Sequence, residues 1–399
     1  MSTTDNVGLY GALAGLRVID LTGVVLGPYA TQILGDYGAD VIKIEPPTGD
    51  IMRHAGPMKH PGMGHIFINA NRNKRSVVLD LKKPEQREQL LALCKTADVL
   101  TYNIRPAAMA RLGLSYETLK AVNPRLVVCG AYGYSEGGPY SDWPAYDDLI
   151  QGAVGMPWLM TQSGSTEPRY APTTFADRVT GLNMVHAVMA AIIARYRTGL
   201  GQHVEVPMFE CLLQFVLGDH LCGETWQPSL GKMGYARLLA VNRKPYATQD
   251  GHICALMYND AHWQAFLQLV GEPDLFQTDP RFATHAERLK NIDALYGVVG
   301  QHMRKRSTAK WMKDLTANDI PVMPMMKLDD LLVDPHLKAT HGWLDVPHPF
   351  EGTLRQLRPP VRMSETPTGV WRPAPLLGEH TEEVLKELSS DTLDTNFLS

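Results

Sequence analysis

A carboxylate stands at the start of the longest apolar helical stretch of the chain. Asp177 lies in the segment Phe175-Ala176-Asp177-Arg178, directly before a helix expected from about Arg178 to Arg197. An aspartate in that place is commonly an N-cap, whose side chain accepts a hydrogen bond from a backbone N–H of the first turn. A carboxylate held rigidly at a helix start, near the edge of a sheet, can also attack a thioester carbonyl and form a mixed anhydride. The two roles do not exclude each other.

A second candidate nucleophile is Ser135, because residues 133–137 (GYSEG) match the G-x-S-x-G pattern of α/β-hydrolases. That pattern needs a strand before the serine and a helix directly after it, since the sharp turn between them exposes the hydroxyl. A strand is expected before Ser135, but Gly138, Pro139 and Pro144 follow it and resist helix formation. Ser135 is therefore predicted to lie in a loop, and a serine hydrolase is kept as a minor alternative.

Other common ligand motifs are missing from the sequence. The turn at residues 22–27 (TGVVLG) is not G-x-G-x-x-G, and no Walker lysine follows a glycine loop. The helix expected to begin at Pro28 still presents free backbone N–H groups, which form an unspecific anion site. His60 and His65 are separated by a Pro/Gly loop, and further metal ligands at suitable spacing are lacking. The sequence predicts no metal site.

The alternation of strands and helices predicts the scaffold that must hold these residues. Strands are expected at residues 17–21, 39–45, 76–81, 99–104 and 126–132. Helices are expected at residues 28–37, 84–97 and 116–122. Such alternation is typical of an α/β fold, in which a mainly parallel sheet is covered by helices on both faces. The Pro/Gly-rich passage at residues 137–144 is expected to form a loop at the carboxyl edge of that sheet.

The chain changes character after residue 224. Loop-rich sequence, a strand near residues 252–256 and further helical patterns predict a smaller α+β domain over residues 225–322. The large domain is expected to begin with residues 1–224, and residues 323–399 are expected to return and complete it. A chain of 399 residues is long enough for two domains.

The composition is that of an ordinary globular protein, and we expect a cytoplasmic location. Hydrophobic residues make up 44% and the net charge is −4, so no global basic field attracts nucleic acid or an anionic membrane. The five cysteines are widely spaced, which is typical of reduced thiols inside the cell. Residues 1–9 lack the features of a secretory signal. The apolar stretch at residues 181–194 is short and interrupted, as in a buried helix and not a membrane span.

Several segments share an order along the chain with a known family. They are residues 15–21 (GLRVIDL), 27–28, 38–45 (GADVIKIE), 49–50 with Arg53, 73–76, 98–99, 146–147 with Gln151, Asp177 with Gly181, 198–199 with 201–202, 250–251 and 376–381 (LLGEHT). Each segment is weak alone, but together they resemble the family III CoA-transferases, the CaiB/BaiF family that includes formyl-CoA and carnitine-CoA transferases. The resemblance runs nearly from end to end.

The resemblance implies a fold, an assembly and a mechanism. The expected subunit is an open ring with a Rossmann-like, CoA-binding large domain, interlocked with a second copy in a homodimer. Asp177 falls on the family's nucleophile, which attacks an acyl-CoA to form an aspartyl anhydride and then an enzyme–CoA thioester. Coenzyme A then passes to a second carboxylic acid. The expected ligands are an acyl-CoA and a small carboxylic acid, with no metal.

The same resemblance assigns the contacts to coenzyme A. The corresponding positions are Val25, Leu26, Leu79 through Lys82, Asn103, Arg111 and Tyr134. Lys82 and Arg111 suit the phosphates of the nucleotide, because cationic side chains form charge-assisted hydrogen bonds with phosphate oxygens. A solvated surface charge is the alternative role for both residues.

The sequence also departs from the pattern of the formyl-CoA branch. Formyl-CoA transferases carry glutamine, arginine and lysine at the positions of Val25, Pro46 and Tyr132, and their tetraglycine loop has no counterpart here. Oxalate and formate are therefore unexpected substrates, and another gate must shield the anhydride from water.

Two further alternatives remain within the resemblance. The α-methylacyl-CoA racemases use a histidine base at the position of Tyr146. Tyrosine is a poor base near neutral pH, since its unperturbed pKa is about 10, so transfer is favoured over racemisation. A non-catalytic CoA-binding protein would keep Lys82 and Arg111 functional and tolerate the loss of the Asp177 carboxylate.

Overall fold

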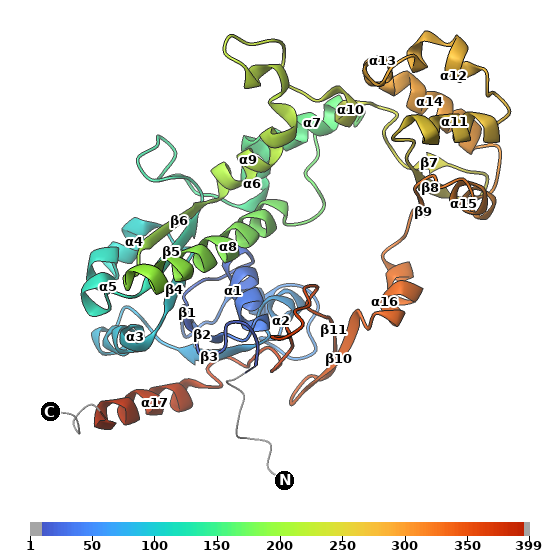
Figure 1. Cartoon of the computed structure of the whole chain (residues 1–399). Helices are drawn as coiled ribbons and strands as arrows, with labels where there is room; N and C mark the ends of the chain where they lie inside the picture. Colours follow the sequence, from blue (N-terminus) through green and yellow to red (C-terminus); the bar gives the residue numbers. More distant parts are fainter. Residues whose placement is uncertain (1–9, 395–399) are drawn as a thin grey trace. The chain divides into compact units, whose positions relative to one another are not determined.

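The computed structural model describes residues 10–394, which pack as two compact units (Figure 1). The larger unit contains the chain up to Val154, Pro172–Leu213 and the chain from His336 onward. The smaller unit contains Gly155–Ala171 and Gln214–Pro335. The domain limits expected at residues 224 and 322 stay a prediction.

A six-stranded parallel sheet forms the middle of the larger unit. The strands are β1 Arg17–Asp20, β2 Asp40–Glu45, β3 Lys74–Val78, β4 Val99–Tyr102, β5 Val127–Tyr132 and β6 His203–Pro207. They lie in the order β3-β2-β1-β4-β5-β6, and every neighbouring pair is parallel. The strand order therefore reverses between β1 and β4. The predicted α/β class with a mainly parallel sheet is confirmed.

Helices cover both faces of this sheet. On one face, α1 Leu26–Asp36 packs against α8 Phe175–Thr198. The apolar core of the other face joins the strands to α3 Pro84–Thr96, α5 Tyr116–Val122 and α17 Thr381–Asp394. Because helices cover both faces, strands in the middle of the sheet are shielded from solvent, and all six residues of β5 are buried.

The strands and helices lie within a few residues of their predicted positions, with two differences that matter. The strand expected at residues 76–81 is β3, which begins two residues earlier, at Lys74, and ends at Val78. The helix expected to begin at Arg178 is α8, which begins at Phe175 and has Thr174 as its N-cap. Asp177 therefore lies in the first turn of α8, and its predicted position as the N-cap is wrong.

Shorter elements complete the larger unit. They are η1 Ile51–His54, α2 His65–Ala70, α4 Pro106–Arg111, α6 Asp147–Ala153, the first part of α9 Met208–His220, α16 Pro335–Ala339, which begins at the last residue of the smaller unit, and the antiparallel hairpin of β10 Trp343–His348 and β11 Gly352–Leu357. The segment before α17 is tied to β3 and to η1. Gly378 N–H donates to Ser76 Oγ in β3, and a guanidinium nitrogen of Arg53 in η1 donates to the Pro375 carbonyl.

The smaller unit combines a three-stranded antiparallel sheet with helices. Its strands are β7 Tyr246–Ala247, β8 His252–Ala255 and β9 Val322–Pro324, in that order. Its helices are α7 Met156–Gln162, the rest of α9, η2 Cys222–Thr225, α10 Ala236–Leu239, α11 Asp260–Leu269, α12 Leu275–Thr278, η3 Pro280–Phe282, α13 His285–Lys290, α14 Ile292–Met303, α15 Thr308–Thr316 and η4 Asp329–Leu332. Trp263, Phe266 and Trp311 lie in its own apolar core.

Between residues 10 and 394, only α8 is long and apolar enough to cross a membrane on length and composition. In its most apolar 18-residue window, 39% of the residues are buried. Since α8 packs against α1 and strands β5 and β6, it has the contacts of a core helix.

Candidate active site

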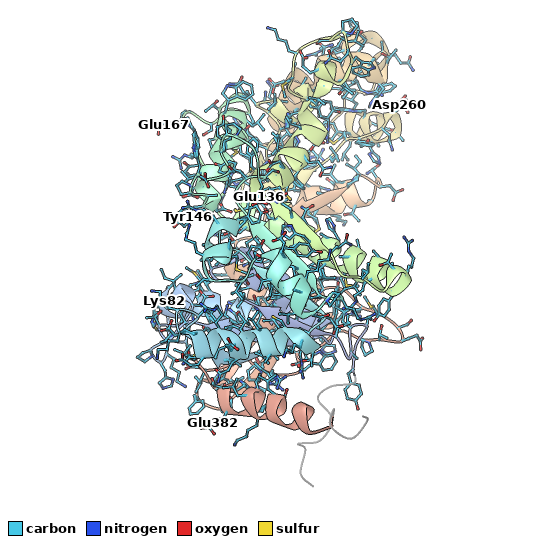
Figure 2. The ribbon with its side chains drawn as sticks, turned by 90° about the vertical axis from the view of Figure 1, so that its left-hand side faces the viewer. Lys82, Glu136, Tyr146, Glu167, Asp260 and Glu382 are labelled. Carbon is cyan, nitrogen blue, oxygen red and sulfur yellow. The ribbon has the colours of Figure 1, made fainter. Side chains whose placement is uncertain are left out.

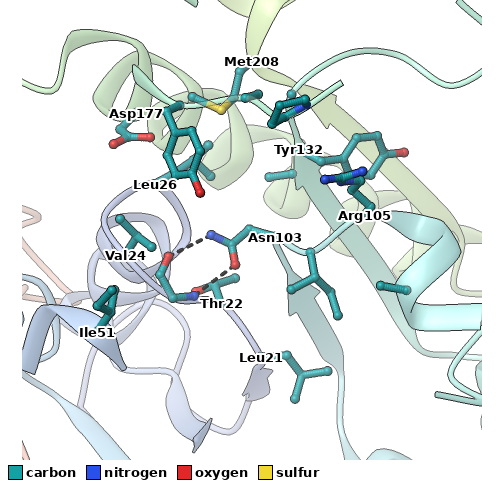
Figure 3. A pocket seen from close by; sticks show the side chains of 18 of the residues that line it. Leu21, Thr22, Val24, Leu26, Ile51, Asn103, Arg105, Tyr132, Asp177 and Met208 are labelled. Carbon is teal, nitrogen blue, oxygen red and sulfur yellow. Dashed lines mark hydrogen bonds between the residues drawn. The ribbon is translucent and has the colours of Figure 1, made fainter. Parts of the chain in front are cut away.

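A cleft of about 770 Å³ opens in the larger unit at the carboxyl ends of β1, β2, β4 and β5. Two hydrogen bonds join the turn after β1 to the residue after β4 (Figure 3). Gly23 N–H donates to Asn103 Oδ1 over 3.0 Å, and Asn103 Nδ2 donates to the Gly23 carbonyl over 2.8 Å. Open α/β sheets bind ligands at such a place, where the strand order reverses. The cleft is therefore the candidate active site.

Asp177 lines this cleft from the first turn of α8. Its backbone N–H donates to Oδ1 of Asp147, at the start of α6, over 3.0 Å. Burial raises the pKa of the Asp177 carboxyl to about 7; the charge of Asp147 adds to this effect and that of Arg178 opposes it. Near neutral pH, the group is therefore divided between the acid and a carboxylate more basic than an ordinary aspartate.

Two glycines allow the elements around Asp177 to approach closely. A Cβ at Gly181, in α8, would lie 2.8 Å from the carbonyl oxygen of Leu26, at the start of α1. A Cβ at Gly27 would lie 2.2 Å from the Cβ of Thr22. Because neither position has room for a side chain, α1 can pack directly on α8 and on the turn after β1. Figure 3 shows Leu26 and Asp177 at the same cleft, with Met208 beside them.

Buried ion pairs form the floor of the cleft. Lys43 Nζ lies 3.0 Å from Asp50 Oδ2, and these side chains are 1% and 2% exposed. Burial alone would lower the pKa of Lys43, but the charges of Asp20, Asp50 and Glu45 raise it. Glu45 in turn pairs with Arg53 at 2.6 Å. A signal for these ion pairs is present in the sequence, because Lys43 and Glu45 alternate with apolar residues in β2.

Three of the predicted CoA contacts line the cleft: Leu26, Asn103 and Arg111. The others lie outside its lining. Val25, Leu79 and Tyr134 are buried, at 3%, 2% and 8% exposure. Lys82 is exposed on the surface of the larger unit (Figure 2). The structure brings the first three together with Asp177, and the contacts of all the predicted residues with coenzyme A stay a prediction.

Several residues that line the cleft carry no recognisable signal in the sequence, including Arg105, Trp143 and Met208. Tyr146 also lines it, at the position where the racemases carry a histidine base. Arg105 donates from a guanidinium nitrogen to the carbonyl of Asp142, 2.9 Å away, and so ties the loop before α6 to α4. This loop overlaps the Pro/Gly-rich passage, and its predicted position at the carboxyl edge of the sheet is confirmed.

Ser135 does not have the surroundings of a hydrolase nucleophile. It follows β5, but the next helix is α6, which begins only at Asp147. Its backbone N–H donates to Glu210 Oε1 over 3.2 Å. The strand–serine–helix turn that would aim the hydroxyl is therefore missing, and the predicted loop position of Ser135 is confirmed.

Among residues 10–394, no group of three His, Cys, Asp or Glu side chains is placed to hold a metal ion. The cysteines of this part of the chain are free thiols: Cys94, Cys129, Cys211, Cys222 and Cys254. Burial raises the pKa of Cys94 and of Cys129 to about 12, so neither is a nucleophile near neutral pH.

Comparisons with known proteins agree on one family. The sequence model of CoA-transferase family III matches residues 13–381. Succinate–glutarate CoA-transferase of Agrobacterium fabrum is 33% identical over 398 residues, which cover 97% of this chain and 98% of the relative. Acetyl-CoA:oxalate CoA-transferase of Acetobacter aceti is 33% identical over 400 residues, covering 98% of this chain and 99% of the relative.

A solved structure supports the same assignment. The crystal structure of a CaiB/BaiF family protein from Brucella suis has a TM-score of 0.80 and 32% identity, over 95% of this chain and 100% of that one. The family recognised from the ordered sequence segments is thus confirmed, as is the prediction that the protein is a CoA-transferase. The chain belongs to CoA-transferase family III.

Proposed function

We propose that this protein moves coenzyme A from an acyl-CoA to a second carboxylic acid, with Asp177 as covalent nucleophile. The observation that carries the proposal is the position of the Asp177 carboxyl. It lines the cleft at the point where the strand order reverses, and burial raises its pKa to about 7. A carboxylate of that basicity is a stronger nucleophile than an ordinary aspartate and is still ionised in about half of the molecules near pH 7.

The proposed exchange conserves atoms at each step. An Asp177 oxygen attacks the thioester carbonyl carbon, the C–S bond breaks, and the CoA thiolate leaves an aspartyl anhydride behind. The thiolate attacks the aspartyl carbonyl, which releases the donor acid and forms an enzyme–CoA thioester. The acceptor carboxylate attacks that thioester and forms a second anhydride. The returning thiolate then attacks the acceptor's carbonyl, which releases the new acyl-CoA and restores the carboxylate.

The cleft supports binding of coenzyme A near this carboxylate. Arg105 and Arg111 line it, and guanidinium groups bind phosphate oxygens with directed, charge-assisted hydrogen bonds. Asn103, also in the lining, has its amide engaged with Gly23, so it orders the turn after β1. Lys82, which is exposed on the surface of the larger unit, is a further candidate phosphate partner.

The substrates are proposed from the relatives. The Agrobacterium fabrum relative and one from Mus musculus are named for succinate or succinyl-CoA and glutarate, and others for oxalate. Because Val25, Pro46 and Tyr132 replace the polar residues of the formyl-CoA branch, we place succinyl-CoA before oxalyl-CoA and formyl-CoA as the first donor to test.

We also propose a homodimer of interlocked subunits, as the family resemblance implies, in the cytoplasm. Large apolar side chains on one side of α8 support a further subunit contact, since Leu182, Ile193 and Tyr196 are at least half exposed. Light scattering coupled to size-exclusion chromatography tests the assembly: a mass of one chain, 44.2 kDa, would contradict it.

The test of the chemistry is to trap the enzyme-bound acyl group. The protein is incubated with succinyl-CoA and other donors, treated with hydroxylamine or borohydride, and digested for peptide mass spectrometry. A donor-dependent modification of Asp177 is expected. Asp148→Asn is a matched control, because Asp148 is an exposed acid of the same region outside the cleft lining.

The outcomes separate the alternatives. A modification that persists in Asp148→Asn and disappears in Asp177→Asn supports the covalent transferase. No modification with any donor, together with deuterium uptake from solvent into a 2-methylacyl-CoA, would replace it with a racemase. Net release of acid that is lost with Ser135→Ala would point to a hydrolase.

A further inference from the structure

The turn between β1 and α1 is held in a strained conformation. Val24 has a φ of 70°, in the left-handed region, where a β-branched residue is a rare outlier. Strain of this kind persists only when the surroundings impose it, and such residues cluster at functional sites. Val24 and Asp177 both line the cleft, so the strained residue belongs to the candidate active site (Figure 3).

Side chains, and not neighbouring strands, hold the backbone of this turn. The Thr22 carbonyl accepts from Lys43 Nζ over 2.8 Å. The N–H and carbonyl of Gly23 are both bound by Asn103. The N–H of Val24 donates to Asp50 Oδ1 over 3.2 Å, so Asp50 is the group that holds the strained residue itself.

Asp50 is bound at both of its carboxylate oxygens. Oδ1 accepts from the N–H groups of Val24 and of Met52, and Oδ2 accepts from Lys43 Nζ. Its own N–H donates to Glu45 Oε2 over 3.0 Å, and Glu45 is fixed by the buried guanidinium of Arg53. The carboxylate is therefore a rigid part of the cleft floor, with all of its oxygens used as acceptors.

The strained turn directly precedes α1. The helix starts at Leu26, two residues after Val24, and the N–H groups of Val25, Leu26 and Gly27 find no acceptor in residues 10–394. The first N–H groups of a helix have no partner inside it and are available to a ligand. If Val24 relaxed to a negative φ, the peptide groups that follow it would change direction at the cleft.

We propose that Asp50 is a positioning residue for catalysis: its buried carboxylate, paired with Lys43, holds Val24 in the left-handed conformation. This contact, called the Asp50 clamp below, sets the direction of the peptide groups at the start of α1, where Leu26 lines the cleft together with Asp177. This inference rests on the proposed CoA-transferase function. Asp50 does not touch the reacting atoms. Its effect passes through the backbone of the turn, and both the transfer rate and coenzyme A binding depend on that backbone.

The test uses Asp50→Asn, which keeps the size of the side chain. Asparagine has one accepting end and one donating end, so it cannot accept from both Lys43 and Val24. The turn should relax, and kcat for transfer per folded molecule should fall by about 100-fold, as is typical when reacting groups are misplaced by about 1 Å. The Kd for coenzyme A, from titration calorimetry, should rise about 10-fold.

A second substitution distinguishes positioning from general damage. Glycine adopts a positive φ without strain, so in Val24→Gly the turn should depend less on the hydrogen bond from residue 24 to Asp50. Measured against the Val24→Gly parent, Asp50→Asn should then cost at least about tenfold less in kcat than it costs in the natural sequence. Asp36→Asn is the matched structural control, because Asp36 is a buried carboxylate that binds Arg72 and Asn73 away from the cleft. It should lower the melting temperature and leave kcat per folded molecule within about threefold.

The two proposals can fail separately. If none of the donors supports transfer by the natural protein, the proposed function fails. Coenzyme A binding to the Asp50 and Val24 variants still tests the Asp50 clamp. The Asp50 clamp is refuted if Asp50→Asn binds coenzyme A and, where transfer occurs, turns over within about threefold of the natural protein. It is equally refuted if Val24→Gly leaves the cost of Asp50→Asn unchanged.

Discussion

The backbone N–H of Asp177 donates to Oδ1 of Asp147 over 3.0 Å, so one carboxylate orients the residue that carries another. Gln151 Nε2 donates to the second oxygen of Asp147 over 2.6 Å and keeps it in place. The pair of acids lies at the starts of α6 and α8, and both line the cleft. Asp147 therefore fixes the position of Asp177 and, through its charge, helps to raise the pKa of Asp177.

Transfer should depend on pH through Asp177. Its pKa is about 7 and the ionised form is the nucleophile, so the single-turnover rate should rise as pH increases through 7 and level off above it. In Asp147→Asn the neighbouring negative charge is gone, while the side-chain oxygen can still accept from Asp177. The pH range over which the single-turnover rate rises should therefore move to lower pH, as rapid-quench measurements from pH 5 to 9 would reveal. An unmoved pH range would show that Asp147 acts on geometry alone.

Asp177 should cost the protein stability when it is ionised. Its pKa is raised in the folded state, so the folded chain binds the proton more tightly, and stability falls as pH rises from about 4 to 7. Above pH 7 the full cost is present, up to about 4 kcal/mol for a shift from 3.8 to about 7. Asp177→Asn should be the more stable protein at pH 8, and this advantage should shrink towards pH 4. Urea unfolding at several pH values measures the free energy of unfolding of both proteins. A stability difference independent of pH would contradict the raised pKa of Asp177.

Gly181→Ala should separate α1 from α8. The added Cβ would lie 2.8 Å from the Leu26 carbonyl and 3.0 Å from a ring carbon of Tyr29. Overpacking of this kind costs about 1 to 3 kcal/mol, and the shift of α1 should also lower kcat. Gly152→Ala is the control, because its Cβ would meet no atom within 4 Å and alanine favours a helix. Thermal unfolding and transfer assays of both variants check the prediction; equal behaviour of the two would refute it.

Lys74→Met should be strongly destabilising. Lys74 is fully buried and donates to Asp20, to Asn71 and to the carbonyl of Pro28. Its loss leaves Asp20 in the core without its closest cation, which costs about 3 to 5 kcal/mol in comparable buried pairs. Lys386→Met is the control, since Lys386 and Glu382 are 81% and 93% exposed and such pairs contribute at most about 1 kcal/mol.

Lys74→Met should also unfold more readily in acid. Burial alone would raise the pKa of Asp20, but the charges of Lys74 and Lys43 lower it to about 2. A lowered pKa adds stability above the unfolded value of about 3.9, and this contribution is lost as pH falls towards 2. Without Lys74, the pKa of Asp20 should rise and the acid unfolding midpoint should move to higher pH. Circular dichroism between pH 2 and 6 would detect that change, and an unchanged midpoint would count against the pair.

Much of the fold follows from local sequence. β5 is a short β-branched and apolar run, and it is buried along its whole length. α8 ends at Thr198, before Gly199, whose φ of 75° suits glycine, and α3 begins with Pro84 at its first position. These signals act over a few residues, so they appear in the sequence without knowledge of what packs where. The start of α8 was misplaced because Phe175 and Ala176 carry no capping signal.

The identity of the family and of Asp177 as candidate nucleophile was also determined by the sequence, through the order of its short motifs. Only the tertiary structure decided what surrounds that carboxylate. Asp147 is thirty residues away along the chain, and its charge matters because α6 and α8 begin side by side in a buried place. Likewise, Asp50 and Val24 meet only because β1 and β2 are neighbouring strands whose ends share one edge of the sheet. A pKa and a strained turn depend on distances across the fold, and local sequence does not encode those distances.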